Sequence, residues 1–156
     1  MRVHVLQVAY GDDEPVTERV ERVAALVRQQ AGADLVVLPE LWAHGGFEYR
    51  SWADRAETVD GPTVRTMAAA ARDAGVVLHA GSIVERLPRD AAPGADRGPQ
   101  GRGLWNTSVV LGPDGGRLAT YRTSHRFGFG AGEPTLLQVG QKVRFEPVGS
   151  LGRSRA

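Results

Sequence analysis

One carboxylate in this sequence, Glu40, directly follows an apolar run of the kind that forms buried strands. The run, Leu35-Val36-Val37-Leu38, contains no polar residue, which favours a strand covered on both faces. Pro39 has no amide hydrogen to donate to a sheet, so the strand ends there and Glu40 emerges at its carboxyl end. Ligands usually bind at that edge of an α/β sheet. Glu40 is therefore a candidate acid or base, although a solvated loop carboxylate would give the same local pattern.

The stretch after Glu40 combines ring-bearing side chains with flexible glycines. It contains a Gly-Gly pair together with Trp42, His44, Phe47 and Tyr49. Such a composition is typical of pocket walls, and it is equally typical of a surface loop whose aromatic residues fill a small satellite core. Both interpretations stay open from the sequence alone.

Several other kinds of site find little support in the sequence. Cysteine is absent, which excludes disulfides, thiolate metal sites and thiol nucleophiles within these residues. The histidines are widely spaced, without the short motifs of metal sites, so we interpret them as structural and expect no metal; they are His4, His44, His79 and His125. The glycines of 128–132 lack the strand, helix and Lys-Ser/Thr of a phosphate loop, and we expect no cofactor. Ser124 or Thr123 as a replacement nucleophile has only its nearness in sequence in its favour.

Length and composition describe an ordinary globular chain. The sequence has 156 residues, 42% of them hydrophobic and 24% charged, with a formal net charge of +1, which fits one soluble domain. No apolar run approaches the roughly 20 residues of a spanning helix, so we expect a cytoplasmic protein without a membrane partner. The arginines of 86–103 are not interleaved with aromatic residues, which argues against nucleic-acid binding.

Alternating strands and helices are predicted around Glu40. Apolar residues at 3–9 predict a first strand covered on both faces, and a valine-rich helical pattern from Val16 to Val27 predicts a helix, so that these elements and the strand at 35–38 form a βαβ unit. A second helix begins near Pro62 and ends at Gly75, and a third strand follows at 76–84. The turn 112–116 predicts a hairpin between strands at 105–111 and 117–121.

A series of short motifs supports a family resemblance. In chain order they are Pro39-Glu40, Asn106-Thr107, Asp114-Gly115, Tyr121-Arg122-Thr123-Ser124-His125-Arg126-Phe127 and Gly132-Glu133. Each motif is weak alone, but their joint order and spacing resemble the nitrilase superfamily of carbon-nitrogen hydrolases. The resemblance implies an α/β fold, the nitrilase-like αββα sandwich, in an incomplete form that supplies roughly its first half. It divides the chain into a partial carbon-nitrogen hydrolase domain at 1–139 and an atypical or truncated C-terminal tail at 140–156.

The resemblance also implies roles for individual residues. In the family a cysteine attacks an amide or nitrile carbon, a glutamate acts as general base and acid, and a lysine stabilises the charge that develops on the substrate. By position, Glu40 is the general base and Glu133 is a second glutamate that orients the site. Thr123 stands at the lysine position. The substrate-binding candidates by resemblance are Trp42, His125 and Phe127.

Two departures from the family pattern predict an inactive chain. Thr123 cannot supply a fixed positive charge, and the only lysine, Lys142, is nineteen residues further on; the nucleophilic cysteine is missing as well. We therefore expect a truncated relative of amide- and nitrile-cleaving hydrolases. The alternative is a pseudoenzyme, or non-catalytic interaction module, that binds a partner chain. A small amide or nitrile is the expected ligand, and a homo-oligomer or a complementary chain is expected to cover the sheet face that half a sandwich leaves open.

Overall fold

The computed structural model describes residues 1–11, 13–88, 90–91, 102–124, 137 and 143–145, with side chains described for all but the last three. Its strands are β1 (Val3–Val5), β2 (Leu35–Val37), β3 (Val77–Arg86), β4 (Leu104–Leu111), β5 (Arg117–Arg122) and β6 (Val143–Phe145). Its helices are α1 (Val16–Arg28), the short 3₁₀ turn η1 (Tyr49–Ser51), α2 (Trp52–Arg55) and α3 (Pro62–Ala74). Within this described part, no helix is long and apolar enough to cross a membrane.

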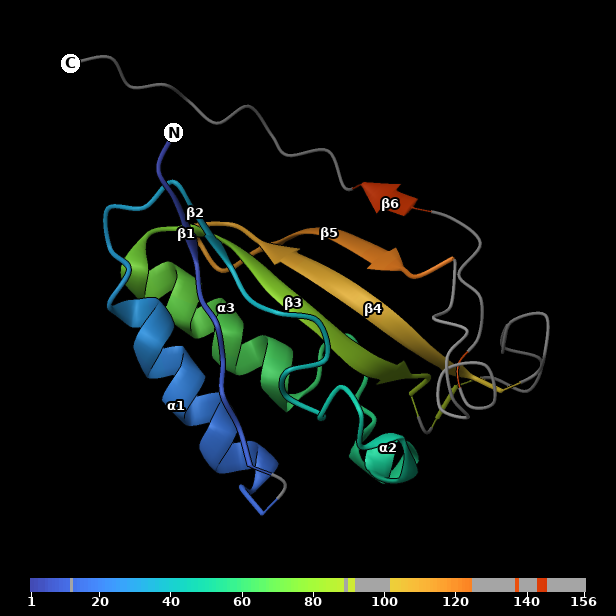
Figure 1. The fold of residues 1–156 in the computed structure, drawn as a ribbon. Coiled ribbons are helices and arrows are strands. Elements are labelled where there is room, and N and C mark those ends of the chain that lie inside the picture. The colour runs from blue at the N-terminus through green and yellow to red at the C-terminus, as the bar shows by residue number, and fades with distance from the viewer. Residues whose placement is uncertain (12, 89, 92–101, 125–136, 138–142, 146–156) are drawn as a thin grey trace.

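The strands form a single mixed sheet in the order β1-β2-β3-β4-β5-β6. β1, β2 and β3 are parallel, whereas β3, β4, β5 and β6 pair antiparallel. The helices α1 and α3 lie side by side and cover the same face of this sheet (Figure 1). The predicted βαβ unit and the predicted hairpin are thereby confirmed. The short strand β6 pairs with β5 and was not predicted from the sequence.

Local sequence explains where the two long helices begin and end. Both carry buried apolar residues at helical spacing, such as Val20, Val23 and Val27 in α1. Pro62 occupies the first turn of α3, where its missing amide hydrogen costs nothing. Gly75 follows α3 in the left-handed conformation, with φ of 66°, and its amide completes the helix end by bonding to Ala71 and Arg72 carbonyls.

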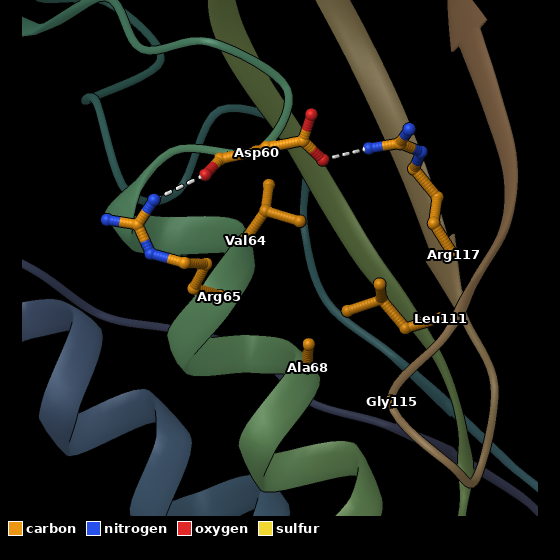
Figure 2. A pocket seen from close by; sticks show the side chains of 7 residues that line it. All are labelled: Asp60, Val64, Arg65, Ala68, Leu111, Gly115 and Arg117. Carbon is orange, nitrogen blue, oxygen red and sulfur yellow. Dashed lines mark hydrogen bonds and ion pairs between the residues drawn. The ribbon is translucent and has the colours of Figure 1, made fainter.

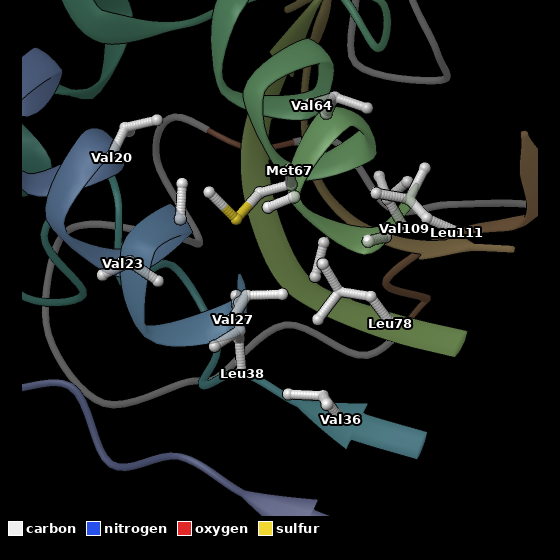
Figure 3. Close-up of a cluster of buried hydrophobic side chains, with 14 of the residues drawn as sticks. Val20, Val23, Val27, Val36, Leu38, Val64, Met67, Leu78, Val109 and Leu111 are labelled. Carbon is white, nitrogen blue, oxygen red and sulfur yellow. The ribbon is translucent and has the colours of Figure 1, made fainter. Parts of the chain in front are cut away.

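The main hydrophobic core lies between the helices and the sheet (Figure 3). Met67 of α3 and Val23 of α1 are 0% exposed, as are Val36 of β2 and Leu78 of β3. Each apolar side chain of this size contributes about 1.5–3 kcal/mol when it is fully buried, so this one-sided contact supplies much of the driving force for folding. The core therefore holds α1, α3 and the parallel strands together as one unit.

No helix of the described residues covers the opposite face of the sheet, which corrects one prediction from the sequence. The strands at 3–9 and 35–38 were expected to be buried on both faces, but Val3 and Val5 are 41% and 71% exposed. By register they share a face with Leu35 and Val37, which are half-buried, whereas Val36 points into the core. Along the same face follow His79 of β3 and Val110 of β4. We call this surface the open face.

A small hollow lies between α3 and the β4–β5 turn. It has a volume of about 380 Å³ and is lined by Asp60, Val64, Arg65, Ala68, Leu111, Gly115 and Arg117 (Figure 2). Asp60 pairs with Arg117 through its carboxylate and accepts a hydrogen bond from Arg65 through its main-chain carbonyl. These contacts attach the hairpin to the start of α3. None of the lining residues belongs to the predicted site.

The strand β3 approaches the chain after β2 unusually closely at Gly81. Its φ is 70°, and a Cβ atom built there would overlap the carbonyl oxygen of Pro39 and contact the Trp42 ring. A glycine inside a strand commonly marks such a bend or close backbone approach. Because Pro39 immediately precedes Glu40, the missing side chain at Gly81 lets the turn that carries Glu40 lie directly on β3.

We expect Gly81→Ala to destabilise the fold far more than Gly75→Ala. Both glycines have positive φ, which costs an alanine about 1 kcal/mol or slightly more, but Gly75 has no neighbouring atom within 4 Å of the new methyl group. The overlap at Gly81 adds a steric cost, for a total of about 3 kcal/mol or more. Urea unfolding of both variants gives the comparison. Equal losses would show that the turn moves away from β3 without cost.

Candidate active site

Glu40 lies in the turn that directly follows β2, at the carboxyl end of that strand. Its carboxylate is exposed, and its Oε1 accepts a hydrogen bond of 2.6 Å from Nδ2 of Asn106 in β4. Asn106 is 2% exposed. Side chains two residues apart in a strand lie on the same face, so Asn106 shares the open face with Ser108 and Val110 of β4. The carboxylate of Glu40 is therefore held at the edge of the open face.

Asn106 also connects Glu40 with Thr123, the residue at the family's lysine position. The Thr123 amide donates a hydrogen bond of 2.9 Å to the Asn106 carbonyl. The side chain and the main chain of one residue thus contact two of the predicted site residues. The sequence placed Asn106 in a motif but assigned it no role, because nothing in the local pattern shows that it meets a carboxylate from 66 positions earlier.

Three predicted site residues cannot be placed. Glu133, His125 and Phe127 all lie outside the described residues. Their predicted roles, the second glutamate and two substrate contacts, therefore stay predictions.

Trp42, the remaining substrate-binding candidate, lies inside the protein. It is 0% exposed, packs in the main core, and donates a hydrogen bond of 3.0 Å from its indole Nε1 to the Ala80 carbonyl. The neighbouring Leu41 has φ of 50° and donates its amide to Oγ of Ser82 at 3.1 Å. Trp42 thus attaches the turn to β3, and its contact with a substrate stays a prediction.

The aromatic residues after Glu40 go to different places: Trp42 belongs to the main core, whereas Tyr49 packs against a second, smaller core, so the satellite-core interpretation holds only in part. Leu41 and Trp52 form a second buried cluster with Val84, and Tyr49 packs against it. The indole of Trp52 donates to the Gly45 carbonyl at 2.8 Å. Phe47 is the one large apolar side chain of 41–52 that projects into solvent, with 89% exposure.

A buried polar group, His44, connects the same stretch to the start of α3. Its Nδ1 accepts a hydrogen bond of 3.3 Å from the Val84 amide, which leaves the ring proton on Nε2. That atom lies 3.5 Å from Oε1 of Glu57, and Glu57 in turn accepts hydrogen bonds from the amide and hydroxyl of Thr63 in α3. Burial by itself would raise the pKa of Glu57, but His44 and Thr63 together hold that pKa below its ordinary value.

A second buried carboxylate belongs to Glu85 in β3. Arg122 donates to both of its oxygens, with 2.8 Å between Nε and Oε2, and Thr107 donates its hydroxyl at 2.6 Å. The Arg122 guanidinium also stacks on the Trp105 ring at 3.9 Å from the centroid. This cluster braces β3, β4 and β5 next to Asn106. Among the described residues, no group of His, Asp and Glu side chains could hold a metal ion.

An exposed carboxylate at the carboxyl end of β2, fixed by an asparagine side chain from β4, two strands away in the sheet, is an arrangement suited to hydrolytic chemistry. The model for the family described as "Carbon-nitrogen hydrolase" matches residues 2–154. The chain therefore belongs to the carbon-nitrogen hydrolase family. The resemblance inferred from the motifs is confirmed, while the predicted domain boundary near residue 139 stays a prediction.

Individual relatives agree with this assignment. The chain is 39% identical to 2-oxoglutaramate amidase of Paenarthrobacter nicotinovorans over 91% of its own length and 45% of that protein. It is 31% identical to omega-amidase NIT2 of Homo sapiens over 71% of its own length and 36% of that protein. The chain thus spans less than half the length of these two curated relatives.

Solved structures share the fold over the same extent. A CN-hydrolase superfamily protein from Xanthomonas campestris, with an arsenic adduct in its active site, matches with a TM-score of 0.70 and 27% identity over 90% of this chain and 46% of that one. An amidase double mutant from Nesterenkonia, in complex with acrylamide, matches with a TM-score of 0.68 over 91% of this chain and 49% of that one, at 21% identity. The nitrilase-like α/β fold class predicted from the sequence is confirmed over about half of these structures.

We expect the stabilising effect of Thr63 to disappear in acid. Because the folded pKa of Glu57 is depressed, the stability that it contributes is fully present above its unfolded pKa and is lost as pH falls through the folded value. Thr63→Val should cost about 2 kcal/mol at pH 7, because a buried hydrogen bond to a carboxylate is lost, and progressively less below about pH 4.

Denaturant unfolding from pH 7 to pH 3 measures this effect. Thr66→Val is the matched control, since Thr66 lies on the same helix and donates no hydrogen bond to Glu57 among the described contacts. If Thr63→Val costs the same free energy of unfolding at every pH in this range, the hydrogen bond from Thr63 does not depend on the charge of Glu57.

Proposed function

We propose that these 156 residues supply the carboxylate side of an amide- or nitrile-hydrolysing site, with Glu40 as its general base and acid. The observation that carries this proposal is the hydrogen bond from Asn106 to Oε1 of Glu40 at the edge of the open face. The other oxygen of Glu40, Oε2, has no hydrogen-bond partner among the described residues. It is therefore the atom that would take up and return a proton. The amidase names of the relatives favour a small amide over a nitrile.

Each part of the proposed site answers a chemical demand. A carboxylate beside a nucleophile removes its proton for attack on the amide carbon, and the resulting acid then protonates the departing nitrogen. A hydrogen bond from Asn106 fixes the carboxylate in one orientation, so that less reorganisation is needed during reaction. Thr123 stands where an oxyanion-stabilising ammonium is expected, and its hydroxyl cannot supply that charge.

We propose further that the chain as written does not hydrolyse amides by itself. It contains no cysteine, and Lys142 is its only lysine. Removal of a catalytic nucleophile commonly lowers kcat by several orders of magnitude, and a lone base cannot replace it. The catalytic proposal therefore assigns the chain the base, with the nucleophile coming from elsewhere.

A second candidate function, a binding module, rests on the open face. Val3 and Val5 expose apolar surface there, and His79 places a buried Nδ1 on this face without a partner among the described residues. A buried polar atom without a hydrogen bond costs about 1–3 kcal/mol, so a covering chain that donates to or accepts from it would stabilise the protein. We propose a second copy of this chain as that cover, with a complementary chain as the other outcome.

We expect no hydrolysis of a simple aliphatic amide or nitrile by the purified chain, and none after Thr123→Lys, because neither protein has a nucleophilic thiol. Ammonia release above the spontaneous rate is the measurement. Glu40→Gln serves as the control, since it removes the base and alters the fold little. Turnover that is abolished by Glu40→Gln would contradict the proposed inactivity while supporting the role of Glu40.

We expect the chain to self-associate through the open face. Light scattering after size-exclusion chromatography should show a mass above that of one chain, and Val5→Lys should reduce it, because the introduced charge would be buried in the contact. Phe47→Lys is the matched control, since Phe47 is exposed in a turn outside the sheet. A monodisperse monomer with a sharp thermal transition would show that the open face needs no cover, and association only with an added complementary chain would favour the other outcome.

A further inference from the structure

We infer that Arg19 is a positioning residue for Glu40. Its buried guanidinium fixes the main chain of the two residues that follow Leu41, and through them the place where the Glu40 carboxylate meets Asn106. The catalytic meaning of this inference rests on the proposed function of Glu40. The contacts of Arg19 themselves do not depend on that function.

The burial of Arg19 is unusual for a charged residue on a helix. Arg19 lies in the first turns of α1 and is 1% exposed. A guanidinium carries five N–H donors, and removing it from water is costly unless each finds an acceptor. All of these donors are used here, by Oε2 and the carbonyl of Glu14 and by the carbonyls of Gly11, Trp42 and Ala43. A site so fully satisfied holds its acceptors in one arrangement.

Two of the acceptors belong to the chain that leaves Glu40. Nη1 of Arg19 donates to the carbonyls of Trp42 and Ala43, at 3.2 Å each. On the opposite side of this short segment, the Leu41 amide and the Trp42 indole donate to β3. The segment is therefore clamped between α1 and β3, and Glu40 is one residue before the clamp. A shift of α1 relative to the sheet would move the carboxylate.

Tyr10 provides a second connection between Arg19 and the same loop. The Arg19 guanidinium stacks over the Tyr10 ring at 4.3 Å from its centroid. The Tyr10 hydroxyl accepts a hydrogen bond of 2.9 Å from the Gly46 amide. Arg19 and Tyr10 together thus hold the loop from Trp42 to Gly46 against the segment that connects β1 to α1.

Arg22 is an arginine of the same helix that does not contact the loop after Glu40. It bonds to the same carboxylate, Glu14, and to the Ala9 carbonyl, but its side chain is 43% exposed and it donates to no residue of the loop. The two arginines share a helix and a partner and differ in whether they contact the chain after Glu40. Arg22 is therefore a matched control for Arg19.

The test follows the side-chain amide of Asn106 by ¹⁵N NMR in the full chain. In Arg19→Lys, three donors replace five, and an ammonium cannot reach acceptors in so many directions. We expect the Asn106 amide signals to move toward those of a solvent-exposed amide and to exchange faster with water, while the main-chain signals of β3 and β4 persist. Arg22→Lys should leave the Asn106 signals unchanged.

Glu40→Gln separates this inference from the proposed function. If Glu40→Gln leaves the Asn106 amide unchanged, the contact between Glu40 and Asn106 is absent and the proposed function loses its basis. If Glu40→Gln shifts the signals and Arg19→Lys does not, the contact stands and the positioning role of Arg19 is overturned. A purely structural role for Arg19 would lower the folded fraction without moving the Asn106 signals of the molecules that remain folded.

Hydrogen exchange in the unaltered chain decides the matter if Arg19→Lys does not fold. The amides of Gly45 and Gly46 are bonded to Leu41 and Tyr10. If Arg19 attaches the loop to α1, these amides should exchange together with those of α1, at similar protection factors. Protection of α1 with rapid exchange at Gly45 and Gly46 would overturn the inference.

Discussion

The close contact between the turn at Glu40 and strand β3 is the constraint on which the site depends. Gly81 has no side chain, so the Pro39 carbonyl can lie against it, and Ser82 and Ala80 on either side bond to Leu41 and the indole of Trp42. A turn held this way has little freedom to move. The position of Glu40 therefore follows from main-chain packing between two parallel strands, and the hydrogen bond from Asn106 then fixes the orientation of its carboxylate.

The two faces of the sheet differ in what covers them. The helices α1 and α3 cover one face and form a core in which residues such as Met67 and Leu78 are 0% exposed. The other face carries the half-exposed apolar side chains and, at its edge, the contact between Glu40 and Asn106. The site and the uncovered surface thus coincide. Whatever covers the open face would also enclose the carboxylate and exclude water from it, which strengthens its electrostatic interactions.

Buried charges brace the surroundings of the site without belonging to it. Glu57 joins His44 to the start of α3, and Glu85 joins Arg122 and Thr107 across three strands. Each carboxylate is matched by several donors, which is the condition under which a buried charge is tolerated. Because these clusters connect the loop after Glu40 and the strand of Asn106 to the rest of the fold, they limit how far the two partners can move apart.

The sequence by itself determined the elements and the family. Hydrophobic spacing located α1 and α3, Pro62 and Gly75 marked the ends of α3, and the motif order from Pro39-Glu40 to Gly132-Glu133 identified a carbon-nitrogen hydrolase. These signals are local, since each depends on neighbouring residues. Only the tertiary structure decided which face of the sheet stays open, that Trp42 is buried, and that Asn106 meets Glu40. It also showed that Arg19 is buried, although charged side chains on helices are usually exposed. Its guanidinium donates to main-chain carbonyls that come from segments distant in the sequence.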